Sequence, residues 1–371
     1  MKIICAALLA SLVAAPVAAG SRTGQLGSVL KKAQEAKKKV DAAHISEQDE
    51  RTLGEQVSAK LIDKYGVVQD ADLTKYVSLV GLSLARSSSR PNLDWQFIVL
   101  DTDGVNAFAA PGGLIHITRG LLGLIKTESE LAGALGHEVT HVTEKHTVRA
   151  IEKQKLAEEG TSSFASNGGL TQAALGRLAN FAYENVLNNS FSRSDEGEAD
   201  QKGERLASRL GYDPHGLPNV LTKIDARNNG NDERNGLFAS HPETKDRIAK
   251  LEQQITSEKL GGTAIVAARY KQHVCYEAKP VTQIATVSDG AAGLAGGGKP
   301  RPAAEQPKKK GGLLGKFNTS SSDQKQSNQT IASAGARGIG ADRDAQGGPN
   351  KTRITVRITP AELEAFKKGI A

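Results

Sequence analysis

Two histidines and a glutamate stand within five residues in the segment HEVTH at 137–141. In an α-helix, residues four apart point in nearly the same direction, so His137 and His141 would project from one face, one turn apart. That spacing suits two imidazole ligands on one tetrahedral zinc ion. Glu138 would lie about 100° around the helix, where it could accept the proton of an attacking water and pass it to a leaving amine. The segment therefore predicts half of a metal-dependent hydrolytic site.

The residues around this motif favour a buried site, although a short HExxH pattern alone can equally mark an ordinary polar helix surface. The preceding residues LAGALG are small and mostly apolar, and apolar side chains recur at helical spacing through the segment. A buried helix of this kind requires polar partners for its histidines. Gly133 would share the face of His137 and allow another backbone to approach closely.

A third ligand has to come from elsewhere in the chain. A metzincin would carry a histidine six residues after His141, but Thr147 occupies that position. His146 lies nine residues after His137, which is about 180° around a continuous helix. His146 is therefore predicted to be a surface residue or the partner of a ligand, and the third ligand is sought in another helix.

The acidic segment FSRSDEGEADQKGERL supplies the better candidates. Glu196 and Asp200 are four residues apart and share a helical face, so Glu196 is predicted to be the third ligand. Asp200 is predicted to accept the free N–H of a ligating histidine and fix its tautomer. Gly203 continues that face, where it would let two helices meet, whereas Glu198 points elsewhere and is expected to be solvated. Alone, the segment would be predicted as a charged helix surface; beside a buried HEVTH helix, it completes the site.

The spacing of apolar residues along the chain predicts the helices and strands that must hold these two helices in place. Ser46 and Gly66 are the start and stop signals of a first amphipathic helix. Strands are expected where β-branched and aromatic residues lie between turn signals, and helices elsewhere. The predicted helices cover 46–66, 70–88, residues from 120 and from 128, a long region ending near 210, a helix beginning at about 217, and 241–255. The predicted strands cover 94–101, 106–110 and 114–118, with a Pro-Gly-Gly turn before the last.

The composition indicates a globular part accompanied by polar segments. The chain has 371 residues, 38% of them hydrophobic and only 4% aromatic, with 39 glycines. Its net charge of +7 would be compatible with nucleic acid or an anionic membrane surface, but the basic residues are scattered and no nucleic-acid motif accompanies them. We therefore expect no nucleic-acid partner.

The two ends of the chain carry different signals from the middle. Residues 1–19 resemble a secretory signal peptide rather than a membrane anchor, and residues 20–45 form a polar helical or disordered arm. Residues 261–287 are expected to form a short β-rich extension, and residues 288–350 a disordered linker. The segment 351–371 is predicted to be a strand followed by a helix. No integral membrane span is expected in the mature chain.

One cysteine, Cys275, remains after the predicted cleavage, so no intramolecular disulfide can staple the fold. We expect this thiol to be buried and inert; pairing between molecules is the alternative.

Four segments together resemble the M48 zinc metallopeptidases, and in particular their soluble periplasmic branch (BepA-like and LoiP-like), which is related to HtpX and the CAAX-prenyl endopeptidases. They are NAFAAPGGLIHITRGLL, ELAGALGHEVTHVTEKH, SRSDEGEAD with Gly203, and SHPETKDRI. The resemblance covers roughly residues 45–255, within a domain predicted at 46–260. No tetratricopeptide array is recognisable after it. The resemblance implies an α+β fold: a mainly α-helical zincin-like (gluzincin) protease domain whose small β-sheet carries an edge strand beside the active-site cleft.

The resemblance also implies the roles of particular residues. One zinc ion per chain would be held by His137, His141 and Glu196, with Glu138 as the general base. An edge strand of Asn106, Ala107, Phe108 and Ala109 would bind an extended peptide by main-chain hydrogen bonds. His241 matches a histidine that can plug the site in some relatives, although it could equally be a capping residue before Pro242. Arg193 is expected to make a structural ion pair.

The predicted function is therefore that of a zinc-dependent endopeptidase in the periplasm, free or associated with the membrane surface. Its substrates would be unfolded, misfolded or misassembled envelope proteins, and outer-membrane assembly machinery is a candidate partner. The alternative is a periplasmic chaperone or assembly scaffold that keeps zinc in a structural or latent site. A third alternative, binding to an anionic surface through the basic tail, predicts salt-sensitive binding.

Overall fold

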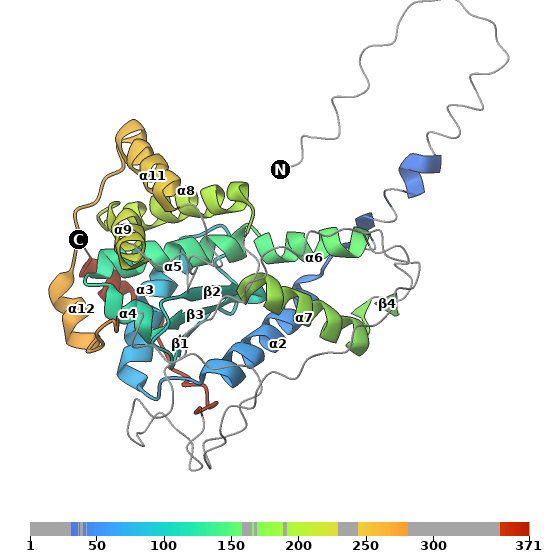
Figure 1. Cartoon of the computed structure of the whole chain (residues 1–371), viewed down its shortest axis with the longest axis horizontal. Coiled ribbons are helices and arrows are strands. Elements are labelled where there is room, and N and C mark those ends of the chain that lie inside the picture. Colours follow the sequence, from blue (N-terminus) through green and yellow to red (C-terminus); the bar gives the residue numbers. More distant parts are fainter. Residues whose placement is uncertain are drawn as a thin grey trace, which may run out of the picture.

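The computed structural model describes residues 31–35, 37, 40–41, 43–157, 165–166, 169–187, 191–228, 244–280 and 349–370. The predicted signal peptide, most of the predicted linker and His241 lie outside these described residues. Within them, helices surround a small three-stranded sheet (Figure 1). The fold is α+β and mainly helical, as the sequence predicted.

The sheet consists of β1 (Gln96–Leu100), β2 (Ala107–Ala110) and β3 (Leu114–Thr118), in the order β1-β3-β2. β1 runs parallel to β3, and β2 runs antiparallel to it. The connection between β2 and β3 is the short 3-10 turn Pro111–Gly113, where Gly112 and Gly113 have φ angles of 72° and 95° that favour glycine. The three predicted strands and the turn are confirmed, and β2 is an edge strand of this sheet.

Each face of the sheet contributes to a separate apolar core, because successive side chains of a strand point in opposite directions. One face packs against α3 (Ala71–Arg86) and α5 (Glu128–Thr143). The other packs against α2 (Glu47–Tyr65) and α7 (Gln172–Leu187). The strand side chains divide accordingly, with Phe97, Val99, Ile115 and Ile117 in the first core and Ile98, Leu100, Phe108 and Leu114 in the second. Burial of these two faces holds α5 rigidly against the sheet.

Local signals fix where α2 begins and ends. The hydroxyl of Ser46 accepts a hydrogen bond from the backbone N–H of Asp49, and Gly66 closes the helix with a φ angle of 75°. The predicted first helix is therefore confirmed at both ends.

Two glycines allow α5 to cross α8 (Arg193–Arg209) at close range. A Cβ atom on Gly203 would lie 2.7 Å from both the carbonyl carbon of Gly136 and the backbone nitrogen of His137. Gly133 likewise faces α9 (Gly216–Asn228), because a Cβ there would lie 2.5 Å from the backbone nitrogen of Leu217. The expectation that Gly133 and Gly203 permit close backbone approach is confirmed. α11 (Thr244–Glu258) packs outside α8 and α9.

The helix that carries HEVTH ends earlier than a continuous pattern predicted. α5 stops at Thr143, Glu144 caps it, and Lys145 has a φ angle of 57°. α6 (His146–Ala157) then starts as a separate helix. The prediction that His146 lies 180° around the same helix was wrong, because the left-handed turn at Lys145 redirects the chain.

The predicted β-rich extension at 261–287 is also wrong in its described part. Residues Ala267–His273 form helix α12. Val266, Tyr270 and Val274 are spaced by four, so they pack together on the first core. The hydroxyl of Tyr270 donates a hydrogen bond of 2.6 Å to the carbonyl of Leu122. This helical spacing outweighs the apparent alternation of apolar and polar residues.

Cys275 is exposed, which contradicts the expectation of a buried thiol. It follows α12 in extended backbone, where Val274 takes the inward position and its neighbour faces outward.

The C-terminal segment packs on the same body. α13 (Pro360–Lys368) is confirmed and opens with a capping box between Thr359 and Glu362. The predicted strand before it is not formed: residues 351–359 join no sheet, and the guanidinium of Arg353 contacts Ser58 and Glu55 of α2 at 2.9 and 2.7 Å.

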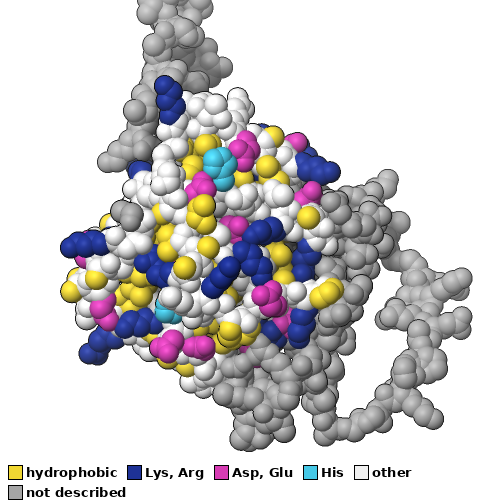
Figure 2. Space-filling model, turned by 90° about the vertical axis from the view of Figure 1, so that its left-hand side faces the viewer, with side chains coloured by type: hydrophobic (Ala, Val, Ile, Leu, Met, Phe, Trp, Pro, Cys, Tyr) yellow, Lys and Arg dark blue, Asp and Glu magenta, His cyan; other side chains and the backbone are white. Residues whose placement is uncertain are grey.

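The remaining described elements are short. They are α4 (Arg119–Leu124) and the two-stranded pair β4 (Ala165–Ser166) and β5 (Gly169–Leu170). On the face drawn in Figure 2, basic and acidic side chains are interspersed.

Candidate metal centre

Three candidate ligand residues converge where α5 crosses α8. The Nε2 atoms of His137 and His141 lie 3.0 Å apart. The carboxylate of Glu196 lies 3.6 Å from the Nε2 of His137 and 3.5 Å from that of His141. All three side chains are buried. The tertiary structure therefore brings together the three residues that the sequence predicted as metal ligands.

These separations suit a tetrahedral metal ion. Donor atoms placed about 2.0–2.2 Å from a zinc ion at tetrahedral angles are about 3.3 Å from one another. The observed range of 3.0 to 3.6 Å brackets that value. Two imidazoles and one carboxylate are also a donor set that catalytic zinc sites use, with a further position left open. The residues present therefore fit a single divalent ion.

Glu138 stands beside this cluster and not within it. It follows His137 on α5 and is 1% exposed. A carboxylate in this position is protected from bulk water and directly follows the candidate ligand His137 on α5. Such a group can take up and return a proton at the site.

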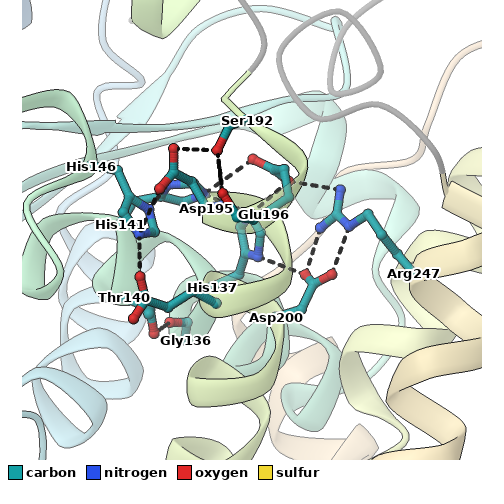
Figure 3. A network of polar contacts seen from close by, with 12 residues as sticks. Gly136, His137, Thr140, His141, His146, Ser192, Asp195, Glu196, Asp200 and Arg247 are labelled. Carbon is teal, nitrogen blue, oxygen red and sulfur yellow. Dashed lines mark hydrogen bonds and ion pairs between the residues drawn. The ribbon is translucent and has the colours of Figure 1, made fainter. Parts of the chain in front are cut away.

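Asp200 contacts His137 through the ring nitrogen that the candidate metal site does not use, and Arg247 holds Asp200 in place (Figure 3). The carboxylate of Asp200 lies 2.9 Å from the Nδ1 of His137, which is the geometry expected for fixing a ligand's tautomer. Arg247 contacts Asp200 through two hydrogen bonds of 2.7 and 2.6 Å, and its Nη1 lies 3.0 Å from Glu196. Burial opposes the ionisation of Asp200, but Arg247 and His137 outweigh it and hold the pKa of Asp200 well below its usual range. The pKa of Arg247 is raised: burial alone would lower it, but Asp200 and Glu196 outweigh that effect.

Arg247 is the functional residue that the sequence analysis missed. It lies in the segment SHPETKDRI, which was noted only for its resemblance. Two buried carboxylates in neighbouring turns of α8 require a cation, and that requirement was the available signal.

The structure selects one of the two predictions for His146 and corrects the one for Glu198. His146 is buried, and its Nδ1 lies 2.7 Å from the Nδ1 of His141, so it is a partner of a candidate ligand and not a surface residue. Glu198 was expected to be solvated, but it is only partly exposed and contacts His146, Arg149 and Lys202. Burial would raise the pKa of Glu198, but Lys202, His146 and Arg149 lower it to about 2.

The predicted substrate strand is β2, and a pocket beside the site is lined by α8 and α11. Asn106 directly precedes β2, and Ala107, Phe108 and Ala109 lie within it on the same sheet edge, where β2 packs against α5. A small pocket lies between α8 and α11, and Arg193, Glu196, Asp200 and Arg247 are among its lining residues. The proposed plug His241 precedes α11 and lies outside the described residues.

A buried His-His-Glu cluster with an adjacent glutamate, carried by two crossing helices beside a small sheet, defines a metallopeptidase-type centre. The chain belongs to peptidase family M48, since residues 71–255 match the model of that family.

Several characterised proteins are similar to this chain. One is the beta-barrel assembly-enhancing protease of Yersinia pestis, 27% identical over 60% of this chain and 47% of its own length. The metalloprotease LoiP of Escherichia coli (strain K12) is 24% identical over 68% of this chain and 97% of its own length. The mitochondrial metalloendopeptidase OMA1 of Schizosaccharomyces pombe is 28% identical over 55% of this chain and 60% of its own length. The chain spans about half the length of the first of these relatives.

Among the residues that the structure describes, no helix is both long and apolar enough to cross a membrane.

Proposed function

We propose that this protein is a zinc-dependent endopeptidase. The observation that carries the proposal is the convergence of three buried ligand atoms within 3.0 to 3.6 Å, with Glu138 beside them. Bound zinc would supply a Lewis acid that polarises the scissile carbonyl and lowers the pKa of water. His137, His141 and Glu196 would hold that ion.

The chain's own residues divide the remaining work. Glu138 takes the proton from the attacking water and delivers it to the leaving amine. Asp200, anchored by Arg247, keeps the ring of His137 in one orientation. The edge strand β2, together with Asn106, binds an extended peptide by main-chain hydrogen bonds, which requires no particular side chains in the substrate.

The proposed substrates are unfolded or misassembled envelope proteins. Two features support this: the predicted signal peptide at 1–19 and the similarity to relatives named beta-barrel assembly-enhancing protease. The periplasm is the proposed location, and outer-membrane assembly machinery is the proposed partner. His241 is proposed to plug the site until substrate displaces it.

The test is the variant Glu138→Gln, assayed with unfolded casein. Loss of a general base should reduce cleavage by about 10²- to 10⁴-fold while the bound metal is retained, because glutamine keeps the shape but cannot accept the proton. Glu277→Gln is the control, since Glu277 is exposed and, among the described residues, pairs with Lys126 at the surface. Unchanged cleavage by Glu138→Gln would contradict the mechanism.

The rival function, a scaffold with a structural zinc site, predicts the opposite response at His241. His241→Ala should raise proteolysis if His241 is a plug. Lost zinc and lost stability in the same variant would instead support a closed four-ligand site.

A further inference from the structure

His146 occupies a position that the proposed mechanism does not use. It is the first residue of α6 and is 2% exposed. Its ring meets that of His141 edge-on, with the centroids 4.7 Å apart and the planes at 80°. The two Nδ1 atoms are 2.7 Å apart, so one imidazole donates a hydrogen bond to the other.

The other nitrogen of His141 decides which ring is the donor. Its Nε2 faces the candidate ligands, 3.0 Å from the Nε2 of His137 and 3.5 Å from the carboxylate of Glu196. A neutral imidazole that binds a metal through Nε2 carries its only proton on Nδ1. His141 is therefore the donor, and the Nδ1 of His146 is the acceptor.

The proton of His146 must then lie on its Nε2, and a carboxylate stands at that atom. The Nε2 of His146 lies 3.2 Å from the Oε2 of Glu198. Glu198 is held in turn by the Nζ of Lys202 at 2.8 Å and by the Nη2 of Arg149 at 3.3 Å. Charge and geometry at Glu198 thus fix the tautomer of His146, and that tautomer offers a lone pair to His141.

We propose that His146 is a positioning residue that fixes the tautomer and ring orientation of His141 by relaying the hydrogen bond of Glu198 across its own ring. The inference rests on the metal site proposed above. It makes the two histidine ligands unequal: His137 is supported directly by the carboxylate of Asp200, whereas His141 is supported by a carboxylate one imidazole further away. The turn at Lys145 makes this possible, because it returns His146 to the ring of His141. Phe191 stacks on His141 at 4.1 Å and limits the same ring from another side.

A second metal ion on His146, Asp195 and Glu198 is the competing explanation, because these residues also offer ligand atoms close together. Arg149 disfavours it, since its Nη2 lies 2.8 Å from Asp195 and 3.3 Å from Glu198. Lys202 adds a second positive charge on Glu198. Two cations already neutralise the carboxylates that a metal would need.

The test compares two variants of the mature full-length chain in a zinc competition titration against a chromophoric chelator. His146→Phe keeps a ring but removes the acceptor, so zinc affinity should fall by about 10- to 100-fold. His146→Asn places an amide oxygen near the former Nδ1 and should restore affinity to within a few-fold of wild type. Zinc content should be one per chain throughout. With ¹⁵N-labelled histidine, NMR of the wild type should show His146 protonated on Nε2.

His116→Phe is the matched control, because His116 is also fully buried but bonds to Ser58 on the other side of the sheet from α5. It should lower stability and leave zinc affinity unchanged. If His146→Phe does not fold, Glu198→Ala provides the second variant. Its zinc affinity should fall by about 10-fold, the lower end of the range expected for His146→Phe. Three outcomes would overturn the inference. His146→Phe could bind zinc with wild-type affinity, or His146→Phe and His146→Asn could lose zinc affinity equally. The zinc content could also fall from two ions per chain in the wild type to one in the variants. A wild-type chain that binds no zinc would overturn the proposed function itself, and the relay with it.

Discussion

The two ends of helix α5 both bury ionisable side chains, but they are completed in different ways. At its first residue, Glu128 is fully buried and accepts hydrogen bonds from the hydroxyls of Tyr76 and Tyr212, at 2.8 and 2.7 Å. The guanidinium of Arg269 adds two further contacts to the same carboxylate. About 13 to 20 Å further along the helix, His137 and His141 meet Glu196.

The Glu128 cluster is complete within the protein. Each carboxylate oxygen has donors, and the negative charge sits at a helix N-terminus that favours it. Burial, followed by the charge of Glu128, raises the pKa of both tyrosines well above the usual range, so they remain protonated donors.

At the other end of α5, the candidate ligand atoms point their lone pairs toward one another. Two imidazole nitrogens 3.0 Å apart and a carboxylate 3.5 to 3.6 Å away are acceptors that a shared cation would satisfy. The difference teaches which buried polar cluster is structural and which suits a ligand. At Glu128 the chain supplies donors to both carboxylate oxygens, whereas at the other end Arg247 pairs with Glu196 but the two imidazoles still face each other at ligand distance.

Metal removal should give the largest effect that separates the two regions. With free zinc at about a thousand times its dissociation constant, chelation should lower the free energy of unfolding by about 4 kcal/mol, because only the folded chain presents the three ligands together. Urea denaturation with and without chelator measures this. Glu196→Ala should be insensitive to chelator; a chelator effect of wild-type size in that variant would place the metal elsewhere.

Glu128→Gln should give the next largest effect, and on stability alone. Loss of the buried charge leaves Arg269 without its partner and should cost about 3 kcal/mol in the free energy of unfolding. Zinc affinity should stay unchanged, because the variant lies at the far end of α5. The surface variant Glu277→Gln should leave the unfolding midpoint unaltered. A parallel loss of zinc affinity in Glu128→Gln would show that the two clusters are coupled through the helix.

A third buried carboxylate, Glu204 on α8, sharpens the comparison because it has neither donors nor ligand residues among the described part of the chain. Burial, with the nearby charges of Asp200, Glu252 and Glu258, raises the pKa of Glu204 to about 8. Between pH 6 and 7.5 the folded state therefore holds a proton that the unfolded state has released, so stability falls as pH rises.

The expected loss over that window is about 2 kcal/mol, at roughly 1.4 kcal/mol per pH unit. Glu204→Gln should abolish this contribution and be more stable than wild type at pH 7.5. Parallel pH profiles for the two proteins, from urea denaturation at each pH, would show that Glu204 ionises normally.

Much of the local structure could be predicted from residue patterns. Ser46 and Gly66 bound α2, and the Pro-Gly-Gly turn separates β2 from β3, because these residues act on the backbone near themselves. Errors came where distant packing decides. The spacing of Val266, Tyr270 and Val274 makes a helix only because a core lies beneath it, and the turn at Lys145 cannot be recognised from residue type.

The sequence by itself determined which side chains could bind a metal, because spacing of four residues on a helix places His137 with His141 and Glu196 with Asp200. Only the tertiary structure decided how the ligands are supported. Gly136 and Gly203 let α5 and α8 approach until the two pairs meet, α11 brings Arg247 to Asp200, and α6 returns His146 to His141. These contacts join residues far apart in the chain or separated by a change of direction, so no periodicity within one element encodes them.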